Sequence, residues 1–309
     1  MTVAVAQPEA APDVGKALET CVEYARKAAA RDVGLLVFPE TWLPGYPIWL
    51  DVTRDVALWD HAPTKDVYAR YAANSIVVGG KETTRLAALA QELGLTIVVG
   101  VSERVDEGPG NGTLFNSLLT FTPDGQLANH HRKLVPTFTE RMVWGLGDAS
   151  GLRAVDTPRG RIGGLVCWEH WMPLARQALH ESGEAIHVAV WPTVHEMHQV
   201  ASRHYAFEGR CFVLAAGTVM RARALPPELE RHPAKAGSDD TWVMRGGSAI
   251  IAPNGSYVAG PVFEEPTLLV ADIDLDDVRR EQMTLDVSGH YARPDCLSFD
   301  IRPAGRTAS

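Results

Sequence analysis

Residues 163–169, GGLVCWE, decide how we interpret the fold. The first four are uncharged and typical of a strand buried on both faces, and Cys167 follows directly. A segment with helical spacing then begins at Met172-Pro173. A cysteine between a strand and a helix is exposed at the carboxyl end of a sheet, where backbone N–H groups face a reacting atom. Core packing is the commonest role of a free cysteine, so this segment alone leaves both interpretations open.

Two further predicted strands lead into charged side chains. An apolar run over residues 33–38 is followed by Glu40, and another strand is followed by Lys133. If the strands are parallel, Glu40 lies at the same sheet edge as Cys167, beside an aromatic- and proline-rich segment at 41–49 that resembles a pocket wall. The alternatives are a carboxylate that caps a nearby loop and a solvated basic cluster around Lys133.

A thiol, a carboxylate and an ammonium that converge at strand ends suit nucleophilic acyl or imidoyl chemistry. The carboxylate takes the thiol proton, the thiol attacks, and the ammonium balances the developing charge. A histidine-paired cysteine protease is the competing arrangement. The residues around Cys167 carry no signature of such a protease, although sequence alone cannot pair this thiol with a histidine.

The rest of the chain alternates strands with helices and hairpins, which predicts one compact α/β domain. We predict strands over residues 3–6, 33–38, 95–101, 113–121, 126–131, 162–166, 186–191, 211–217, 248–252, 256–259 and 268–273. We predict helices over residues 14–30, 83–93, 173–180, 197–209 and 275–282. Residues 226–240 are polar and proline-rich and are interpreted as a surface excursion.

Composition narrows the possible partners. The 309 residues carry a formal net charge of −9, which argues against a nucleic-acid or anionic-membrane partner. The sequence contains no run of about 18 apolar residues, the length of a membrane span. Residues 1–8 lack the features of a signal peptide, so we expect a cytoplasmic protein. The four cysteines form no C-x-x-C pair, and His195 and His198 lack the i, i+4 spacing of a helical zinc site, so no metal is expected.

Short motifs along nearly the whole chain share one family pattern. Together they resemble the nitrilase branch of the nitrilase superfamily, the carbon–nitrogen hydrolases. The motifs occur in the family's order, which makes chance a poor explanation. They are Phe38-Pro39-Glu40, Pro44-Gly45-Tyr46-Pro47, His131-Arg132-Lys133-Leu134, Pro136-Thr137, Glu140-Arg141, Trp144-Gly145, Gly147-Asp148, Cys167-Trp168-Glu169, Met172-Pro173-Leu174 and Gly289-His290-Tyr291-Ala292-Arg293-Pro294-Asp295.

The resemblance implies a role for each matching residue. Cys167 would be the nucleophile, and Glu40 the general base that later activates water. Lys133 would stabilise the tetrahedral intermediate and help to protonate nitrogen. Glu140 would orient Lys133 and the substrate, and the backbone N–H of Trp168 would help to hold the developing charge. No metal or organic cofactor is implied.

The resemblance also implies an architecture. The family fold is a four-layer α-β-β-α sandwich that pairs into a dimer, so we expect a homodimer or a higher homo-oligomer. Residues 1–285 would form the carbon–nitrogen hydrolase domain. Residues 286–309 would form a C-terminal tail at the dimer interface, since residues 289–295 match the segment that crosses to a partner subunit.

The implied activity is that of a nitrilase, which hydrolyses an organic nitrile to a carboxylic acid and ammonia through a thioimidate and a thioester. An amidase, a cyanide-converting relative and a catalytically silent scaffold are the alternatives. Several aromatic residues flank the catalytic motifs and could favour aromatic or arylaliphatic nitriles, with structural packing as the equal alternative. The residues expected to contact substrate are Trp168, Tyr46, Trp144, Trp191 and His195.

Overall fold

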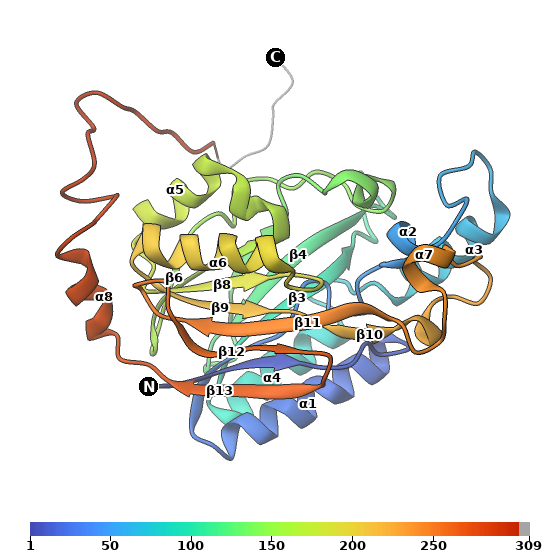
Figure 1. The fold of residues 1–309 in the computed structure, drawn as a ribbon, viewed down its shortest axis with the longest axis horizontal. Helices are drawn as coiled ribbons and strands as arrows, with labels where there is room; N and C mark the ends of the chain where they lie inside the picture. The colour runs from blue at the N-terminus through green and yellow to red at the C-terminus, as the bar shows by residue number, and fades with distance from the viewer. Residues whose placement is uncertain (303–309) are drawn as a thin grey trace.

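Two β-sheets packed face to face form the centre of the molecule. The computed structural model describes residues 1–302. Helices α1 (Val14–Ala29) and α4 (Lys81–Leu93) cover the outer face of one sheet, and α5 (Pro173–Glu181) and α6 (Glu196–Gly209) cover the outer face of the other (Figure 1). The layers therefore follow the order α-β-β-α, which confirms the predicted fold class.

The first sheet has six strands in the order β13-β1-β2-β3-β4-β5. Strands β1, β2 and β3 are parallel, and β13, β4 and β5 pair antiparallel with their neighbours. The bounds are β1 Thr2–Gln7, β2 Val33–Val37, β3 Thr96–Arg104, β4 Leu114–Phe121, β5 Leu127–Arg132 and β13 Thr267–Asp272. Since β4 reverses β3 and β5 reverses β4, strand β5 points in the same direction as β2.

The second sheet has the order β10-β11-β9-β8-β7-β6, with β12 paired to β11. Its centre is the parallel trio β7, β8 and β9. The bounds are β6 Val155–Thr157, β7 Gly160–Val166, β8 Ile186–Val190, β9 Phe212–Ala216, β10 Val219–Arg221, β11 Trp242–Ile251 and β12 Tyr257–Phe263.

The alternation of side chains along β1 shows how the layers are built. Val3 and Val5 face the core between the two sheets, whereas Ala4 and Ala6 face the helices α1 and α4. Successive residues of a strand point to opposite faces, so a strand buried on both sides must be apolar throughout. Each large apolar side chain buried in this way contributes about 1.5–3 kcal/mol.

The predicted strands and helices are all present, with ends that differ by a few residues, and β11 begins earlier than expected, at Trp242. The sequence analysis missed β6, β10, the short helix α2 (Trp49–Val52) and the helix α3 (Ala62–Asn74). Helix α3 buries only Val67, so it lacks the apolar periodicity that identified the other helices. The 226–240 segment contains the short helix α7 (Pro233–Ala236) and is tied to α3 by the ion pair of Arg70 with Glu228.

After α8 (Asp276–Gln282) the described chain is irregular, as predicted, and runs along the outside of the body (Figure 1). Within residues 1–302, no helix combines the length and the apolar character needed to cross a membrane.

Candidate active site

The three side chains predicted to carry the chemistry follow three strands of the two sheets. Glu40 comes shortly after β2, Lys133 directly after β5, and Cys167 directly after β7. Because β2 and β5 point the same way, their ends meet at one edge of the first sheet. Cys167 reaches this edge from the second sheet, so the site lies where the two sheets meet.

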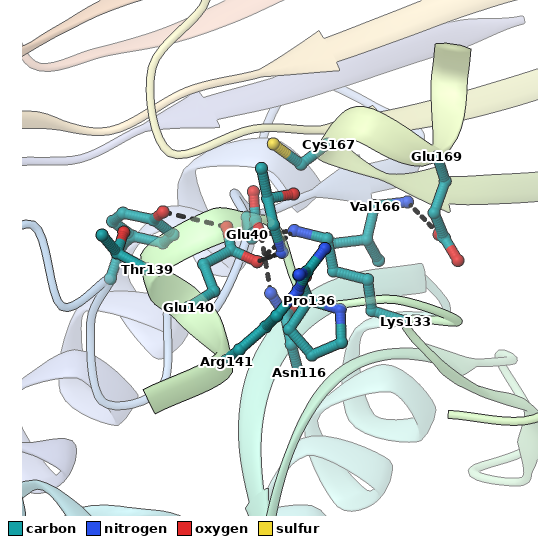
Figure 2. Close-up of polar contacts among 12 residues, drawn as sticks. Glu40, Asn116, Lys133, Pro136, Thr139, Glu140, Arg141, Val166, Cys167 and Glu169 are labelled. Atoms are coloured by element: carbon teal, nitrogen blue, oxygen red, sulfur yellow. Dashed lines mark hydrogen bonds and ion pairs between the residues drawn. The ribbon is translucent and has the colours of Figure 1, made fainter. Parts of the chain in front are cut away.

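The structure brings Glu40, Lys133, Glu140 and Cys167 together. The ammonium of Lys133 lies 3.0 Å from Oε1 of Glu40 and 2.7 Å from Oε2 of Glu140. A carboxylate oxygen of each glutamate and Sγ of Cys167 all lie within 4.8 Å of one another. Figure 2 shows the two glutamates and the lysine converging next to Cys167. All four residues are buried.

Asn116, on β4, joins two of these groups and was not predicted. Its side-chain amide donates to Oε1 of Glu40 at 2.6 Å (Figure 2). Its backbone carbonyl oxygen accepts from the backbone N–H of Lys133 at 2.7 Å. The signal was present in the sequence, because an asparagine inside a buried apolar strand needs a polar partner.

The Glu40 segment lies against the sheet only because residue 100 on β3 is a glycine. A Cβ atom at Gly100 would lie 2.3 Å from the carbonyl oxygen of Pro39 and 2.7 Å from Cα of Glu40. The end of a flexible side chain can move away from such a contact, but these backbone atoms cannot. Gly100 therefore sets how deeply Glu40 is buried.

Two donors hold the carboxylate of Glu140 in addition to Lys133. The hydroxyl of Tyr46 donates to Oε1 at 2.9 Å, and the backbone N–H of Thr137 donates to Oε2 at 2.8 Å. The second bond belongs to the capping box of the 3₁₀ turn Phe138–Met142, which places Glu140 at a fixed point beside Lys133.

The backbone at Cys167 has a φ of 52°, in the left-handed region that non-glycine residues rarely adopt. The buried carboxylate of Glu169 supports this turn, accepting the backbone N–H groups of Val166 and Leu134 at 2.8 Å each. It also contacts Nε2 of His131 at 3.0 Å. Glu169 thus ties the nucleophile segment to the segment that carries Lys133, a role that the sequence motif did not reveal.

Burial and charge set the protonation of the site. Burial raises the pKa of Glu40 to about 7, against the opposing effect of the Lys133 ammonium. Burial also raises the pKa of the Cys167 thiol well above its usual value, and the Glu40 charge adds to this effect. Although burial alone would lower the pKa of Lys133, the negative charges of its partners hold it above the usual value. The resting site thus pairs a neutral thiol with a carboxylate that can accept its proton near neutral pH.

Glu40, Glu140 and Cys167 are also a donor set of the kind that binds metal ions. The ammonium of Lys133, however, already lies between the two carboxylates at hydrogen-bonding distance. A cation at the same place would be repelled by that charge. The arrangement suits proton transfer from a thiol better than metal coordination.

A pocket of about 350 Å³ opens over Cys167. Three of the five residues expected to contact substrate line it, namely Tyr46, Trp168 and His195. The pocket is lined by Tyr46, Ile48, Asp51, Thr137, Phe138, Thr139, Glu140, Cys167, Trp168, Pro192, Thr193, His195 and His198.

The structure does not bring Trp144 and Trp191 to this pocket. Trp144 is buried behind Tyr46, with ring centroids 6.0 Å apart, and its indole N–H donates to Ser102. Trp191 is fully buried and stacks on the rings of His170 and His198. Both tryptophans support residues of the wall, which is the packing alternative considered for them from the sequence.

Comparison with known proteins agrees with this site. The carbon-nitrogen hydrolase family model matches residues 2–281. The chain is 41% identical to an aliphatic nitrilase of Sinorhizobium fredii over 99% of this chain and 96% of that protein. It is 38% identical to a bifunctional nitrilase/nitrile hydratase of Nicotiana tabacum over 94% of this chain and 82% of that protein. A carbon-nitrogen hydrolase of Helicobacter pylori G27, 18% identical, shares the fold with a TM-score of 0.71 over 96% of this chain and 97% of that chain. With its sheets, its buried Glu-Lys-Cys cluster and these relatives, the chain belongs to the carbon–nitrogen hydrolase family.

Proposed function

We propose that this enzyme is a nitrilase that converts an organic nitrile and two water molecules into a carboxylic acid and ammonia. The observation that carries the proposal is the buried cluster of Glu40, Lys133 and Glu140 within reach of the Cys167 thiol at one pocket. The similarity to two proteins named as nitrilases supports the choice of a nitrile.

The first step forms a bond between sulfur and the nitrile carbon. Glu40 takes the proton of the Cys167 thiol as Sγ attacks, and one π bond of the nitrile becomes the new lone pair on nitrogen. That nitrogen takes a proton from Lys133, the proton held by Glu40 replaces it, and the product is a thioimidate with Glu40 ionised again. Lys133 lies beside both acids and stabilises the negative charge that develops on nitrogen.

Hydrolysis then proceeds in two stages. Glu40 takes a proton from a first water, which adds to the thioimidate carbon, and passes this proton to nitrogen through Lys133. The added hydroxyl then loses its own proton to nitrogen as the carbonyl forms, and the carbon–nitrogen bond breaks to release ammonia and leave a thioester. A second water, activated in the same way, breaks the carbon–sulfur bond. The carboxylic acid leaves and the thiol of Cys167 is restored. If the first tetrahedral intermediate expels sulfur instead, an amide is released.

The pocket favours a nitrile with an apolar substituent. Ile48, Phe138 and Pro192 line it together with Tyr46 and Trp168. The Sinorhizobium fredii relative is named an aliphatic nitrilase, and the aromatic side chains of this wall also suit an arylaliphatic substrate. We propose both classes as substrates, with Tyr46, Trp168 and His195 in contact with the substituent.

Amide release is a second outcome with specific support, since the Nicotiana tabacum relative is named as both a nitrilase and a nitrile hydratase. The partition depends on whether nitrogen or sulfur leaves the same intermediate. Lys133, held between Glu40 and Glu140, is the buried ammonium that can protonate the leaving nitrogen.

Ammonia release tests the proposal. The purified enzyme is offered an aliphatic nitrile, phenylacetonitrile, benzonitrile, cyanide and the matching amides, with Cys167→Ala as the control. We expect ammonia and acid from nitriles and none from the variant. Turnover of amides alone would indicate an amidase, and turnover of cyanide alone a cyanide-converting enzyme.

We further propose that residues 1–285 form the hydrolase domain and that the tail 286–309 contacts a partner copy of this chain. Residues 303–309 lie outside the described part of the structure. Within the described part of the tail, Tyr291 and Leu297 are 63% and 76% exposed on a segment outside the body (Figure 1). Large apolar side chains in such a position are suited to an interface between subunits.

A further inference from the structure

A row of buried polar groups runs from the backbone of Cys167 away from the pocket. Nδ1 of His170 lies 2.7 Å from the carbonyl oxygen of Cys167, and Nε2 of His170 lies 3.0 Å from Nε2 of His187. Nδ1 of His187 lies 2.8 Å from Oε2 of Glu184. His170, His187 and Glu184 are all buried, and none of them has a role in the hydrolytic steps described above.

The partners in this row fix the number of protons. A carbonyl oxygen only accepts, so His170 carries a proton on Nδ1. An ionised carboxylate also only accepts, so His187 carries a proton on its Nδ1. The contact between the two Nε2 atoms requires one proton more. Two imidazoles therefore share three protons and one positive charge, which the charge of Glu184 balances.

The contact of its Nδ1 with the Glu184 carboxylate places that positive charge on His187. Burial and the neighbouring His187 lower the pKa of His170 well below its usual value, so His170 is the neutral ring that accepts at Nε2. Burial opposes ionisation of Glu184, but the nearby His187 and His180 lower the pKa of this carboxyl to about 2. The other titratable groups around the row are His180 on α5, His198, Tyr205 and Glu208 on α6, and Cys211 before β9.

A glycine on the strand that ends at Cys167 makes room for this carboxylate. Gly163 of β7 pairs with His187 of β8, and a Cβ atom at Gly163 would lie 2.0 Å from Oε2 of Glu184. Any side chain at this position would displace the group that balances His187. The strand is therefore shaped around the same row of groups that reaches its last residue.

The row ends on the peptide group that faces the reacting atoms. The carbonyl of Cys167 and the N–H of Trp168 belong to one planar trans peptide and point in opposite directions. A strong donor at the carbonyl polarises the peptide, and hydrogen bonds in a chain strengthen one another. The Trp168 N–H donates to the Cys167 thiol and thereby lowers its pKa. Polarisation of the peptide makes this N–H a stronger donor.

We infer that Glu184, His187 and His170 form a charged relay that orients and polarises the Cys167–Trp168 peptide, with His187 as a positioning residue for the nucleophile. His187 bears the positive charge and donates to His170, which in turn donates to the carbonyl of Cys167. The relay also holds Cys167 in its left-handed conformation, which is strained for a non-glycine residue. The inference rests on Cys167 acting as the proposed nucleophile.

His187→Gln tests the relay, because it removes the positive charge and retains a polar side chain. His232→Gln is the matched control, since it makes the same substitution at an exposed histidine before α7, outside the row. Alkylation of Cys167 by iodoacetamide is followed against pH on the peptide that contains it, in a background where the exposed Cys296 is changed to serine. This readout does not require nitrile turnover, so it separates a failure of the relay from a failure of the nitrilase assignment.

We expect His187→Gln to lower kcat about 10-fold, because the Trp168 N–H donor is weakened and not removed. KM should change by less than about 2-fold. The apparent pKa of the Cys167 thiol should rise in that variant. His232→Gln should leave kcat and the alkylation profile within about 2-fold of the parent. Equal effects of the two variants, or an unchanged alkylation profile in His187→Gln, would overturn the inference.

A measurement on the unaltered protein covers the case in which His187→Gln does not fold. Nitrogen-15 spectra of histidine-labelled enzyme at neutral pH report which ring nitrogens carry protons. We expect both nitrogens of His187 to be protonated and only Nδ1 of His170. Two neutral rings would contradict the charged relay.

Discussion

At the scale of single residues, the site depends on one ammonium shared by two buried carboxylates. Lys133 pairs with both Glu40 and Glu140, so one negative charge remains without a matching cation. Burial makes this costly and raises the pKa of Glu40, which turns that glutamate into a base suited to neutral pH. The resemblance in the sequence indicated these residues, but only the structure provides the electrostatic reason.

Glu40→Gln should remove the base and retain the fold. A glutamine can still accept from Asn116 and Lys133 through its carbonyl oxygen, so the buried contacts persist. We expect kcat on nitriles to fall about 100- to 10,000-fold, the range typical of a lost general base. Ammonia release per folded enzyme, with circular dichroism as the check on folding, measures this. A loss below about 10-fold would assign the proton transfer to another group.

The raised pKa of Glu40 predicts how activity depends on pH. The ionised carboxylate is the active form, so kcat/KM should fall as the pH decreases through about 7. Glu140→Gln removes a charge that helps to raise this pKa, so any residual activity should show the acid limb at lower pH. A parent limb near pH 4.5, the ordinary value of a glutamate, would show that Glu40 does not control it.

At the scale of elements, strand ends and close backbone contacts position the site. The sequence was sufficient to place Glu40, Lys133 and Cys167 after strands. A buried strand is an apolar run, and the point where that run stops marks the end of the strand. It did not reveal Asn116 or Glu169, whose partners come from other elements. Such contacts depend on how the two sheets pack against each other, and the periodicity of side chains along one strand carries no information about that packing.

Gly100→Ala tests the close contact between β3 and the Glu40 segment. The added Cβ would meet the backbone of Pro39 and Glu40, so we expect a loss of about 1–3 kcal/mol in unfolding free energy. Activity per folded enzyme should also fall, because the displaced backbone moves the carboxylate of Glu40 from its place beside Lys133. Denaturant unfolding and ammonia release measure the two effects. Gly15→Ala, at an exposed position of α1, is the control: it should leave activity unchanged and change the unfolding free energy by no more than about 1 kcal/mol. Full activity of Gly100→Ala would contradict this role.

Glu169→Ala tests the tie between the nucleophile segment and the Lys133 segment. It leaves His131 and two backbone N–H groups without their buried acceptor, so we expect a loss of about 3–5 kcal/mol in unfolding free energy. Denaturant unfolding measures the change. Glu181→Ala, an exposed glutamate at the end of α5, should stay within about 0.5 kcal/mol of the parent. A similar small change in Glu169→Ala would show that the tie is not needed.

At the scale of the whole molecule, two sheets pack face to face, and the ends of their strands place the thiol of Cys167 near its base, Glu40. Strand–helix alternation predicted an α/β domain, and the family resemblance implied its four layers, but the order of the strands came only from the structure. Helix α3 and the short helix α7 within the 226–240 segment were missed because each buries a single apolar side chain. Their arrangement depends on long-range contacts such as Arg70 with Glu228.

Removal of residues 286–309 tests the proposed contact between copies. We expect the molar mass in light scattering to fall to that of a monomer, because the exposed Tyr291 and Leu297 leave with the tail. A chain without residues 303–309 keeps the motif at 289–295 and should retain the assembly. An unchanged mass after the longer deletion would place the interface elsewhere.

The most direct test of the central claim is to trap the bond between Cys167 and a nitrile. The enzyme is mixed with a nitrile labelled with nitrogen-15, quenched with acid within one turnover, and digested for mass spectrometry. The account predicts that the label is retained as a thioimidate on the peptide that contains Cys167, and that Cys167→Ala carries none. Two results would contradict it: labelled ammonia is released although the peptide never carries the label, or Cys167→Ala is as active as the parent.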